Sequence, residues 1–239
     1  MKIDYVVISS DDNPMYKDFY EIVSKRWNQF GIKVYYINIT NVDEIIENEY
    51  GIIHKIKSLD GFSSGFQSQI VRLYAANLID GNILTSDIDM LPLSKDYFLS
   101  RSSIADESKI LIYSGQPYGD VPYYQLCYIL ANTRLYRDCL QISNLSFYDF
   151  CKLLKEKYNE AWNSDEHFMY DQFQNHLDKL TILRDRDLSW GGETKRIDRS
   201  NWRYSLELLH NNYYVDSHLL RPYTTYKYDI DFLVNNIKN

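Results

Sequence analysis

Residues 3–39 of the chain read IDYVVISSDDNPMYKDFYEIVSKRWNQFGIKVYYINI. Segments 3–9 and 33–39 are rich in β-branched and aromatic residues, which is typical of buried strands. Between them, residues 15–30 carry apolar side chains at helical spacing, and Gly31 follows as a helix-ending residue. A strand, a helix and a second strand in this order predict a parallel sheet with a right-handed crossover.

The alternation of strands and helices continues, so we expect one α/β domain over residues 1–239. Residues 66–79 have the spacing of an amphipathic helix, and Gly81 leads into an apolar strand at 82–86. The sequence contains no repeat and no linker rich in Pro, Gly or Ser. Further strands are expected at 110–114, 123–131 (antiparallel) and 181–183. Further helices are expected at 135–158, with a break near 143–144, at 229–237, and in a segment that begins at 164. Residues 42–56 are expected to be partly helical, and residues 189–201 to form a mobile loop.

Two carboxylates, Asp87 and Asp89, follow the strand at 82–86, and an apolar run at 90–93 comes next. Residues i and i+2 of an extended chain point to the same side, with Cα atoms roughly 6.6 Å apart. Aspartates this close repel each other unless a cation lies between them, and carboxylates suit Mg²⁺ or Mn²⁺. Because such an ion shares its other positions with water and phosphates, we expect a nucleotide diphosphate substrate. A solvated turn is the structural alternative, but the apolar flanks favour the carboxyl end of a core strand.

Further residues could complete a metal and phosphate site. His218 lies near Asp216 and is a candidate third metal ligand, while Arg221 could pair with a phosphate. Arg72, on the helix before the metal strand, could reach the phosphates or the nucleotide. The structural alternatives are a satisfied histidine, a salt bridge of Arg221 to Asp216, and a surface arginine with a buried stem. His210 is a competing histidine, but its leucine neighbours suit helix packing. Two basic residues of the loop at 189–201 could close over a diphosphate: Lys195 and Arg196.

Acidic residues at the start of the helix from 164 are candidates for a general base. Asp165 and Glu166 occupy its first turn, where a carboxylate within about 3 Å of a hydroxyl could deprotonate it. The structural alternative is that both acids complement the amino end of the helix. Glu193, in Trp190-Gly191-Gly192-Glu193, is a rival base because glycines allow close approach to a ligand.

The composition describes a globular protein with an acidic surface. A net charge of −7 does not favour nucleic acid or an anionic membrane as a partner. The three cysteines, Cys127, Cys139 and Cys151, form no C-x-x-C pattern and fit reduced, buried thiols better than disulfides or a zinc site. There is no signal-peptide pattern and no apolar run of about 18 residues. We therefore expect a cytoplasmic protein without a transmembrane segment.

Together these features resemble the nucleotide-sugar-dependent glycosyltransferases of the GT-A fold, the class that carries an Asp-x-Asp motif. The match runs from the β-α-β unit through Arg72 and Asp87-Ile88-Asp89 to the acidic pair at 165–166 and to His218. The size is similar to small glycosyltransferase domains of bacterial surface-polysaccharide systems and of large DNA viruses. The resemblance implies a Rossmann-like mixed, mostly parallel sheet flanked by helices. It also implies that residues 1–93 bind the nucleotide sugar and the metal, and that residues 94–239 bind the acceptor.

The resemblance further implies a role for each matched residue. Asp89 binds Mn²⁺ (or Mg²⁺) directly, Asp87 contacts the ribose or the waters of the metal, and His218 completes the metal shell. In inverting members, an acid at the start of the later helix deprotonates the acceptor, with Asp165 the first choice and Glu166 the second. The loop after the first strand holds the base and ribose through Ser9, Ser10, Asp11 and Asn13.

UDP is the favoured nucleotide, because family members with this metal motif commonly use it. The donor sugar, the acceptor and the stereochemistry remain open, and a retaining enzyme would not need the base. The run at 190–193 resembles an acceptor-site stretch of some galactosyltransferases, but the aspartates that follow there are missing. Catalysis is therefore not assigned to Glu193.

Other functions of this fold class fit the sequence less well. A sugar nucleotidyltransferase needs a glycine-rich loop with a basic residue after the first strand, where this chain has Ser-Ser-Asp-Asp-Asn-Pro at 9–14. A phosphatase with an aspartyl nucleophile needs its Asp-x-Asp after the first strand, not in the middle of the chain. A non-catalytic module that binds nucleotide sugar or glycan remains the alternative from another class.

Overall fold

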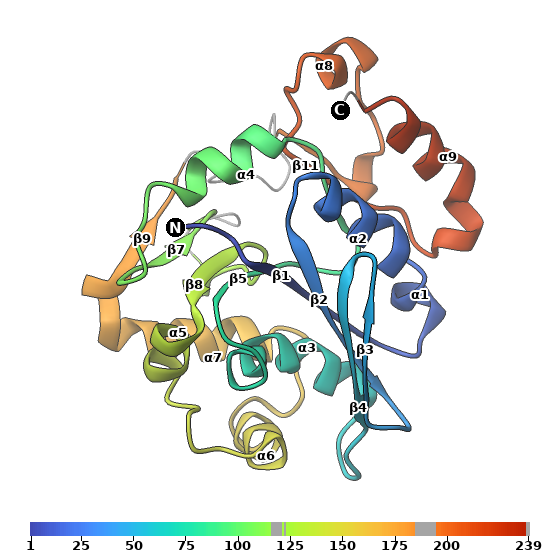
Figure 1. Cartoon of the computed structure of the whole chain (residues 1–239). Coiled ribbons are helices and arrows are strands. Elements are labelled where there is room, and N and C mark those ends of the chain that lie inside the picture. Colours follow the sequence, from blue (N-terminus) through green and yellow to red (C-terminus); the bar gives the residue numbers. More distant parts are fainter. Residues whose placement is uncertain (116–120, 122, 185–194, 238–239) are drawn as a thin grey trace.

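The computed structural model describes residues 1–115, 121, 123–184 and 195–237. Over these residues the chain forms an eight-stranded mixed sheet and a separate three-stranded sheet (Figure 1). The order of the large sheet is β3-β4-β2-β1-β5-β8-β7-β9, and that of the small sheet is β10-β11-β6. The strands are β1 (Tyr5–Asp11), β2 (Lys33–Thr40), β3 (Glu44–Asn48), β4 (Gly51–Lys57), β5 (Asn82–Thr85), β6 (Met90–Pro92), β7 (Ile110–Ile112), β8 (Ile129–Asn132), β9 (Leu180–Ile182), β10 (Arg196–Ile197) and β11 (Asp216–His218).

The predicted β-α-β unit is confirmed. β1 runs parallel to β2 on one side and to β5 on the other. The helix expected at 15–30 is divided into α1 (Pro14–Lys17) and α2 (Tyr20–Gln29). Asn13 caps α1, because its Oδ1 accepts from the backbone N–H of Met15 at 3.0 Å.

Helices cover both faces of the large sheet, which explains why its central strands are apolar throughout. Successive side chains of β1 point to opposite faces. Val6 and Ile8 pack in one core cluster with Trp27 of α2, whereas Val7 packs in another with Ile70 of α3. On the first face lie α2 and α4 (Lys95–Ser102), with α9 (Tyr223–Asn235) packed beside α2. On the second lie α3 (Ser64–Tyr74), α5 (Thr133–Leu140) and α7 (Ser164–Phe173), with α6 (Phe147–Tyr158) packed against α3 and α7 (Figure 1). The remaining helical segments are α8 (Leu206–His210) and the 3-10 turns η1 (Ala75–Asn77), η2 (Gln174–Lys179) and η3 (Arg199–Asn201).

The small sheet joins the segment after β5 to the carboxyl-terminal part of the chain. β6 and β11 run antiparallel, with Met90 opposite His218. The backbone N–H of Leu219 donates to the carbonyl oxygen of Asp89 at 2.9 Å. This register places His218 beside Asp89, although the two residues are far apart in the sequence.

The expectation of partial helix at 42–56 is wrong, because this segment forms the antiparallel hairpin of β3 and β4. The turn is closed by Asn48, whose Oδ1 accepts from the backbone N–H groups of Tyr50 at 3.0 Å and Gly51 at 3.2 Å. Gly51 has a φ of +144°, and a Cβ there would lie 2.1 Å from the carbonyl oxygen of Val34. The hairpin packs at the edge of the sheet, where exposed polar residues conceal the alternation of a strand.

The other expected elements are present with changed bounds. The helix at 66–79 is α3 with η1, the helix at 135–158 is α5 and α6, and the helix at 229–237 is the longer α9. The antiparallel strand at 123–131 is confirmed as β8, but it begins only at Ile129. The loop expectation at 189–201 is wrong for its described part, which contains β10 and η3; residues 189–194 lie outside the described residues.

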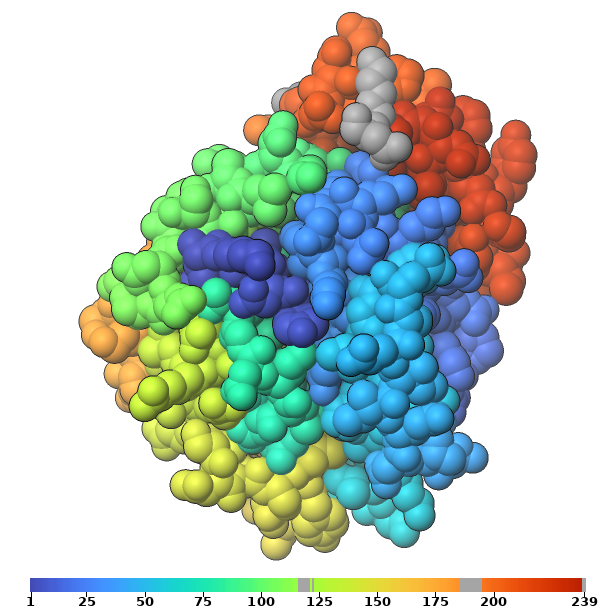
Figure 2. All heavy atoms as spheres, in the orientation of Figure 1, coloured from blue at the N-terminus to red at the C-terminus, as the bar shows by residue number. Residues whose placement is uncertain are grey.

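The two ends of the chain pack against different parts of the molecule. The amino-terminal ammonium of Met1 donates to the carbonyl oxygens of Ser102 and Ala105 at the end of α4. Figure 2 shows this dark blue end lying against the green segment that contains α4, and the orange and red carboxyl-terminal segments covering one end of the molecule. The three cysteines are buried and unbridged, as predicted. Within the described ranges, no helix has the length and apolar character needed to cross a membrane.

Candidate functional site

A pocket of about 690 Å³ opens at the carboxyl ends of β1 and β5. Parallel strands β1 and β5 bring the loop at 9–13 next to the segment at 86–89, because the backbone N–H of Ser86 still donates to the carbonyl oxygen of Val7. This is the edge of an open α/β sheet where ligands bind. The pocket lining includes the following residues named by the sequence analysis: Ser9, Ser10, Asp11, Asn13, Arg72, Asp87, Asp89, Asp165, Glu166, His218 and Arg221.

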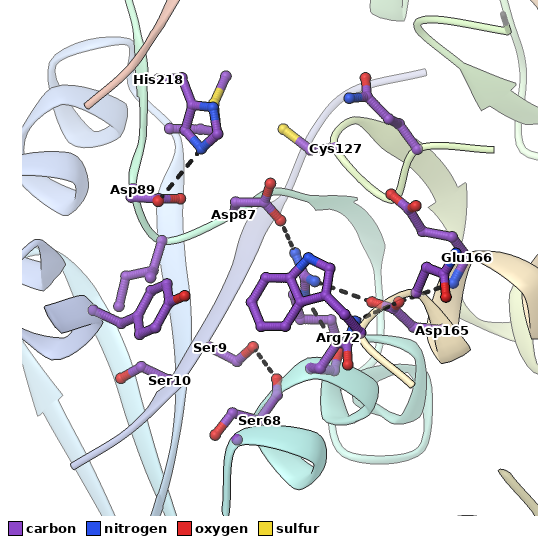
Figure 3. A pocket seen from close by; sticks show the side chains of 18 of the residues that line it. Ser9, Ser10, Ser68, Arg72, Asp87, Asp89, Cys127, Asp165, Glu166 and His218 are labelled. Atoms are coloured by element: carbon purple, nitrogen blue, oxygen red, sulfur yellow. Dashed lines mark hydrogen bonds and ion pairs between the residues drawn. The ribbon is translucent and has the colours of Figure 1, made fainter. Parts of the chain in front are cut away.

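Arg72 links the first aspartate of the Asp-x-Asp motif to the acidic pair at the start of α7 (Figure 3). Its Nη1 donates to Asp87, and its Nη2 donates to Asp165 Oδ2 at 3.1 Å. The Arg72 side chain is only 11% exposed and that of Asp165 only 1%. The structure therefore places Arg72 between two carboxylates, not on the surface.

Asp89 and His218 face each other on the other side of the pocket (Figure 3). The antiparallel pairing of β6 with β11 brings His218 Nε2 to 3.4 Å from Asp89 Oδ2. Both side chains are largely buried. Asp87 points to Arg72 instead of joining this pair, so the two aspartates of the motif have different partners.

Two residues beside this pair were missed by the sequence analysis. Asp198 lies behind the imidazole, with its Oδ2 3.5 Å from His218 Nδ1. Arg199 Nη1 donates to Asp89 Oδ2 at 2.6 Å. Both residues belong to the polar segment that was expected to be a mobile loop. They could have been identified from the acidic and basic pair at 198–199, which directly follows the apolar Ile197. Ile197 is buried in β10.

Arg221 also faces Asp89, with its Nε 3.5 Å from Oδ2 and its guanidinium 4.8 Å from the ring centre of Tyr16. The suggested salt bridge of Arg221 to Asp216 does not form, because Asp216 is paired with Arg196. That pair is buried and bidentate. Arg196 lines the pocket but is held by this carboxylate, so it is not a loop cation that closes over a ligand.

The cations around Asp89 control the ionisation of the pair. Burial raises the pKa of Asp89, but hydrogen bonding and charge from His218, with the charges of Arg199 and Arg221, outweigh it and hold this pKa well below its usual range. Burial lowers the pKa of His218, but hydrogen bonds to Asp198 and Asp89 outweigh it and raise this pKa above its usual value. A metal ion that uses the imidazole nitrogen would therefore have to displace a proton.

The Asp89 and His218 pair fits one hard cation as neighbouring ligands. Two such ligands, each about 2.1 Å from an octahedral ion, lie about 3 Å apart, close to the observed 3.4 Å. Asp198 behind the imidazole is the kind of partner that orients a metal-binding histidine. Within the described part of the chain, no cluster of three His, Cys, Asp or Glu side chains is placed to hold a metal. A bound cation would therefore complete its coordination with water or ligand phosphates.

The acidic pair at the start of α7 carries protons more readily than ordinary carboxylic acids. Burial is the main cause, and it raises the pKa of Asp165 despite the charge of Arg72. Burial and the charge of Asp165 together raise the pKa of Glu166 to about 8. Both oxygens of Asp165 are engaged, by Gln69 and the Glu166 backbone N–H at Oδ1 and by Arg72 at Oδ2. Glu166 is only partly buried and accepts a long 3.4 Å bond from the backbone N–H of Leu126.

The segment after β1 lines the pocket with side chains that also hold the local structure. Ser9 Oγ donates to the carbonyl oxygen of Ser68 at 2.5 Å, and Ser10 Oγ shares a 2.6 Å hydrogen bond with the Tyr36 hydroxyl. Asp11 accepts from Ser64 Oγ at 2.7 Å, and Asn13 caps α1. The remaining sequence candidates lie elsewhere: His210 ends α8, Lys195 is exposed, and Glu193 lies outside the described residues.

Solved structures of other proteins share this fold. The chain is similar to the galactosyltransferase LgtC in complex with donor and acceptor sugar analogs, with a TM-score of 0.54 and 13% identity over 98% of this chain and 96% of that chain. It is also similar to the glycosyltransferase GlyE of Streptococcus pneumoniae TIGR4, with a TM-score of 0.50 and 14% identity over 77% of this chain. The match covers 46% of the GlyE chain, so this chain spans about half of its length. No protein-family model and no curated protein matches the sequence. The likeness confirms the fold that the sequence resemblance implied, that of the GT-A glycosyltransferases.

We predict that Arg72→Ala destabilises the protein by about 3–5 kcal/mol, because it leaves the buried carboxylate of Asp165 and its neighbour Asp87 without their cation. The control is Lys152→Ala, which removes an exposed ion pair to Glu156 on α6 and is expected to cost about 0–1 kcal/mol. Urea unfolding of both variants measures the difference. Equal stability of the two variants would show that the buried charge group is not a structural element.

We also predict that Arg199→Gln strengthens Mn²⁺ binding by about tenfold in the absence of nucleotide. The guanidinium competes for Asp89 Oδ2, and a charge-assisted hydrogen bond of this kind contributes about 1.5–3 kcal/mol. Titration of free Mn²⁺ by electron paramagnetic resonance gives the affinity directly. Arg203→Gln, an exposed arginine of the same segment, is the control and should bind Mn²⁺ as the unmodified protein does. Weaker binding in Arg199→Gln would contradict the competition.

Proposed function

We propose that this protein is a metal-dependent glycosyltransferase that moves a sugar from a nucleoside diphosphate donor to a hydroxyl of a glycan acceptor. The observation that carries the proposal is that one pocket at the sheet edge holds both the Asp89 and His218 pair and the acids Asp165 and Glu166. The first pair suits a cation that binds a diphosphate, and the second suits proton transfer. The fold shared with glycosyltransferases supports the same reaction class.

The donor is held at the side of the pocket that carries Asp89. A divalent cation bound there, Mn²⁺ or Mg²⁺, supplies charge neutralisation of the leaving diphosphate as a Lewis acid. Arg199 and Arg221 already lie against Asp89, and either guanidinium can turn to a phosphate, which its fork geometry suits. The base and ribose lie along residues 9–13, and we take UDP as the nucleotide.

Asp87 and Arg72 have a positioning role in this proposal. Arg72 holds Asp87 at the edge of the donor site and Asp165 at the start of α7. The buried side chain of Arg72 therefore sets the distance between the donor site and the acid pair. Residues 1–93 supply the donor and metal side together with His218, Arg199 and Arg221 from the later part of the chain, and residues 94–239 also supply the acid pair beside the acceptor. Alignment of donor and acceptor accounts for much of the acceleration available in such a reaction.

Glu166 is the general base that the contacts favour, and Asp165 is the residue that holds it in place. Asp165 has each oxygen engaged, whereas Glu166 is partly exposed to the pocket and makes one long contact. A carboxylate with a raised pKa is a better proton acceptor at neutral pH than an ordinary one. The proton of the acceptor hydroxyl passes to Glu166 as the oxygen attacks the anomeric carbon and the diphosphate leaves.

The proposal is tested with a panel of nucleotide sugars, each assayed for binding by calorimetry and for hydrolysis or transfer, with Mn²⁺ and with EDTA. Asp89→Asn is expected to abolish metal-dependent donor binding and to lower turnover by at least a hundredfold, because it removes the anionic metal ligand. Asp229→Asn, on the exposed side of α9, is the matched control. Circular dichroism checks that both variants fold.

Two results would separate the alternatives. Metal-dependent binding without turnover for every donor would favour the non-catalytic binding module. Turnover that is undiminished in Asp89→Asn and unaffected by EDTA would falsify the metal site.

We predict that Glu166→Gln lowers transfer by about 10²–10⁴-fold, the usual contribution of a general base. The base acts when ionised, so the rate of the unmodified protein rises with pH toward about 8, the raised pKa of Glu166, and then levels off. This rising limb should be absent from the residual activity of the variant. A limb of unchanged position in the variant would assign the base elsewhere.

The same substitution should stabilise the fold at alkaline pH. A carboxyl group whose pKa is raised on folding binds its proton more tightly in the folded state, so stability is full below the unfolded pKa of about 4.3 and is lost as pH rises toward 8. Thermal unfolding at pH 4 and pH 8 should show the gain of Glu166→Gln only at pH 8. Glu156→Gln, exposed on α6, is the control and should change neither value.

A further inference from the structure

Trp162 has an unusual environment for a tryptophan. It lies between α6 and α7, it is 72% exposed, and it lines the pocket that contains Arg72 and Asp165. Indole side chains are normally well buried, as Trp27 is in the core of this protein. An indole left in water at the mouth of a pocket has apolar surface that a ligand can cover.

The turn that carries Trp162 is fixed by polar contacts. The Glu160 carboxylate accepts from the backbone N–H and Oγ of Ser63 at 3.2 and 2.9 Å and pairs with Lys155 Nζ at 2.7 Å. Asn159 and Glu160 have positive φ angles of 51° and 54°, which non-glycine residues rarely adopt. Beyond the indole, the backbone N–H of Ser164 donates to the carbonyl oxygen of Ala161 at 3.0 Å.

Consecutive left-handed residues cost folding free energy and persist where surrounding contacts hold them. Here the contacts of Glu160 hold the backbone that presents Trp162. The exposed indole is therefore attached to a defined turn, which reduces the ordering cost when a ligand binds against it. This combination of strain, anchoring and exposure has no role in the packing of the core.

The groups next to the indole match the chemistry of a sugar. A pyranose has a face of C–H groups, which packs on an aromatic ring, and an edge of hydroxyls, which bind planar amides and carboxylates. Asn163 follows Trp162 and shares a 3.0 Å contact with His167 Nε2, and Gln69 donates to Asp165 at the pocket wall. Glu166 is four residues beyond the indole, on the first turn of α7.

We propose that Trp162 is the platform on which the acceptor sugar stacks, so that the acceptor is a glycan with a terminal pyranose. This inference rests on the proposed function. The donor is tied through its diphosphate to the side of the pocket that carries Asp89 and His218. The Trp162 ring is 72% exposed, so a ligand at the mouth of the pocket can bury most of its surface. Because Trp162 comes just before α7, a sugar stacked on it would lie beside Glu166.

The test uses methyl α- and β-pyranosides of glucose, galactose, mannose and xylose as acceptors, with the donor identified by the nucleotide-sugar panel. Trp162→Ala should raise the acceptor KM by about tenfold or more, since stacked aromatic residues dominate the binding energy of such sites. Trp162→Tyr should restore most of the affinity, because its ring offers a similar face. Tyr228→Ala, which removes an 81% exposed aromatic side chain from α9, is the matched control and should leave the acceptor KM unchanged.

A second measurement does not depend on turnover. Saturation-transfer NMR of the pyranosides with the unmodified protein should show contact through their ring C–H protons, and Trp162→Ala should lose it while Trp162→Tyr keeps it. Absence of donor turnover together with this contact would reject the proposed reaction but support the platform. An unchanged acceptor KM, an increase confined to the donor Kd, or efficient transfer to serine peptides regardless of residue 162 would each overturn the inference.

Discussion

The burial of Arg72 between Asp87 and Asp165 is the constraint on which the pocket depends. The guanidinium comes from α3, one carboxylate from the end of β5 and the other from the first turn of α7, so a single side chain joins the sheet edge to the helix layer. The buried charges of Arg72 and Asp165 are costly unless they are paired, and Asp87, whose side chain is 38% exposed, completes the group. The folding of the core and the shape of the site are therefore coupled through one arginine.

Two clusters of side chains, one around Asp89 and one around Glu166, lie on either side of Arg72 and shift carboxyl pKa values in opposite directions. Around Asp89, three cationic or protonated groups hold the pKa of the carboxyl low, so this side chain stays the anion that the proposed metal site needs. Around Glu166, burial and a neighbouring acid raise the pKa, which keeps a proton acceptor effective near neutral pH. Acids whose surroundings shift their pKa values in opposite directions within one pocket are suited to different tasks. The transfer proposed above uses both tasks, since one ligand leaves as an anion while the other loses a proton.

Local patterns in the sequence predicted the central sheet and most of the pocket, because short strands, helix spacing and the motif at 87–89 are encoded by adjacent residues. His218 was a candidate from its charged neighbours and from the resemblance, but its place beside Asp89 is caused by the register of β6 with β11, which no local pattern reveals. Asp198 and Arg199 were missed because a short polar segment shows no periodicity, although the buried Ile197 fixes it in place. The hairpin of β3 and β4 was missed for a related reason. Its outer strand, β3, lies at the sheet edge, where exposed side chains hide the alternation that identifies a strand.

The features that oppose folding gather around the same pocket. Asn159 and Glu160 adopt left-handed conformations, Trp162 leaves its ring in water, and Glu166 forms no ion pair with the described residues, whereas Asp165 pairs with Arg72. In a protein selected for stability alone, a glycine at 159, a polar residue at 162 and a glutamine at 166 would cost less. Their concentration within a few residues of the start of α7 argues that this end of the pocket is shaped by what it binds. The buried pairs of Arg72 and Arg196 then supply the rigidity that allows such residues to remain in place.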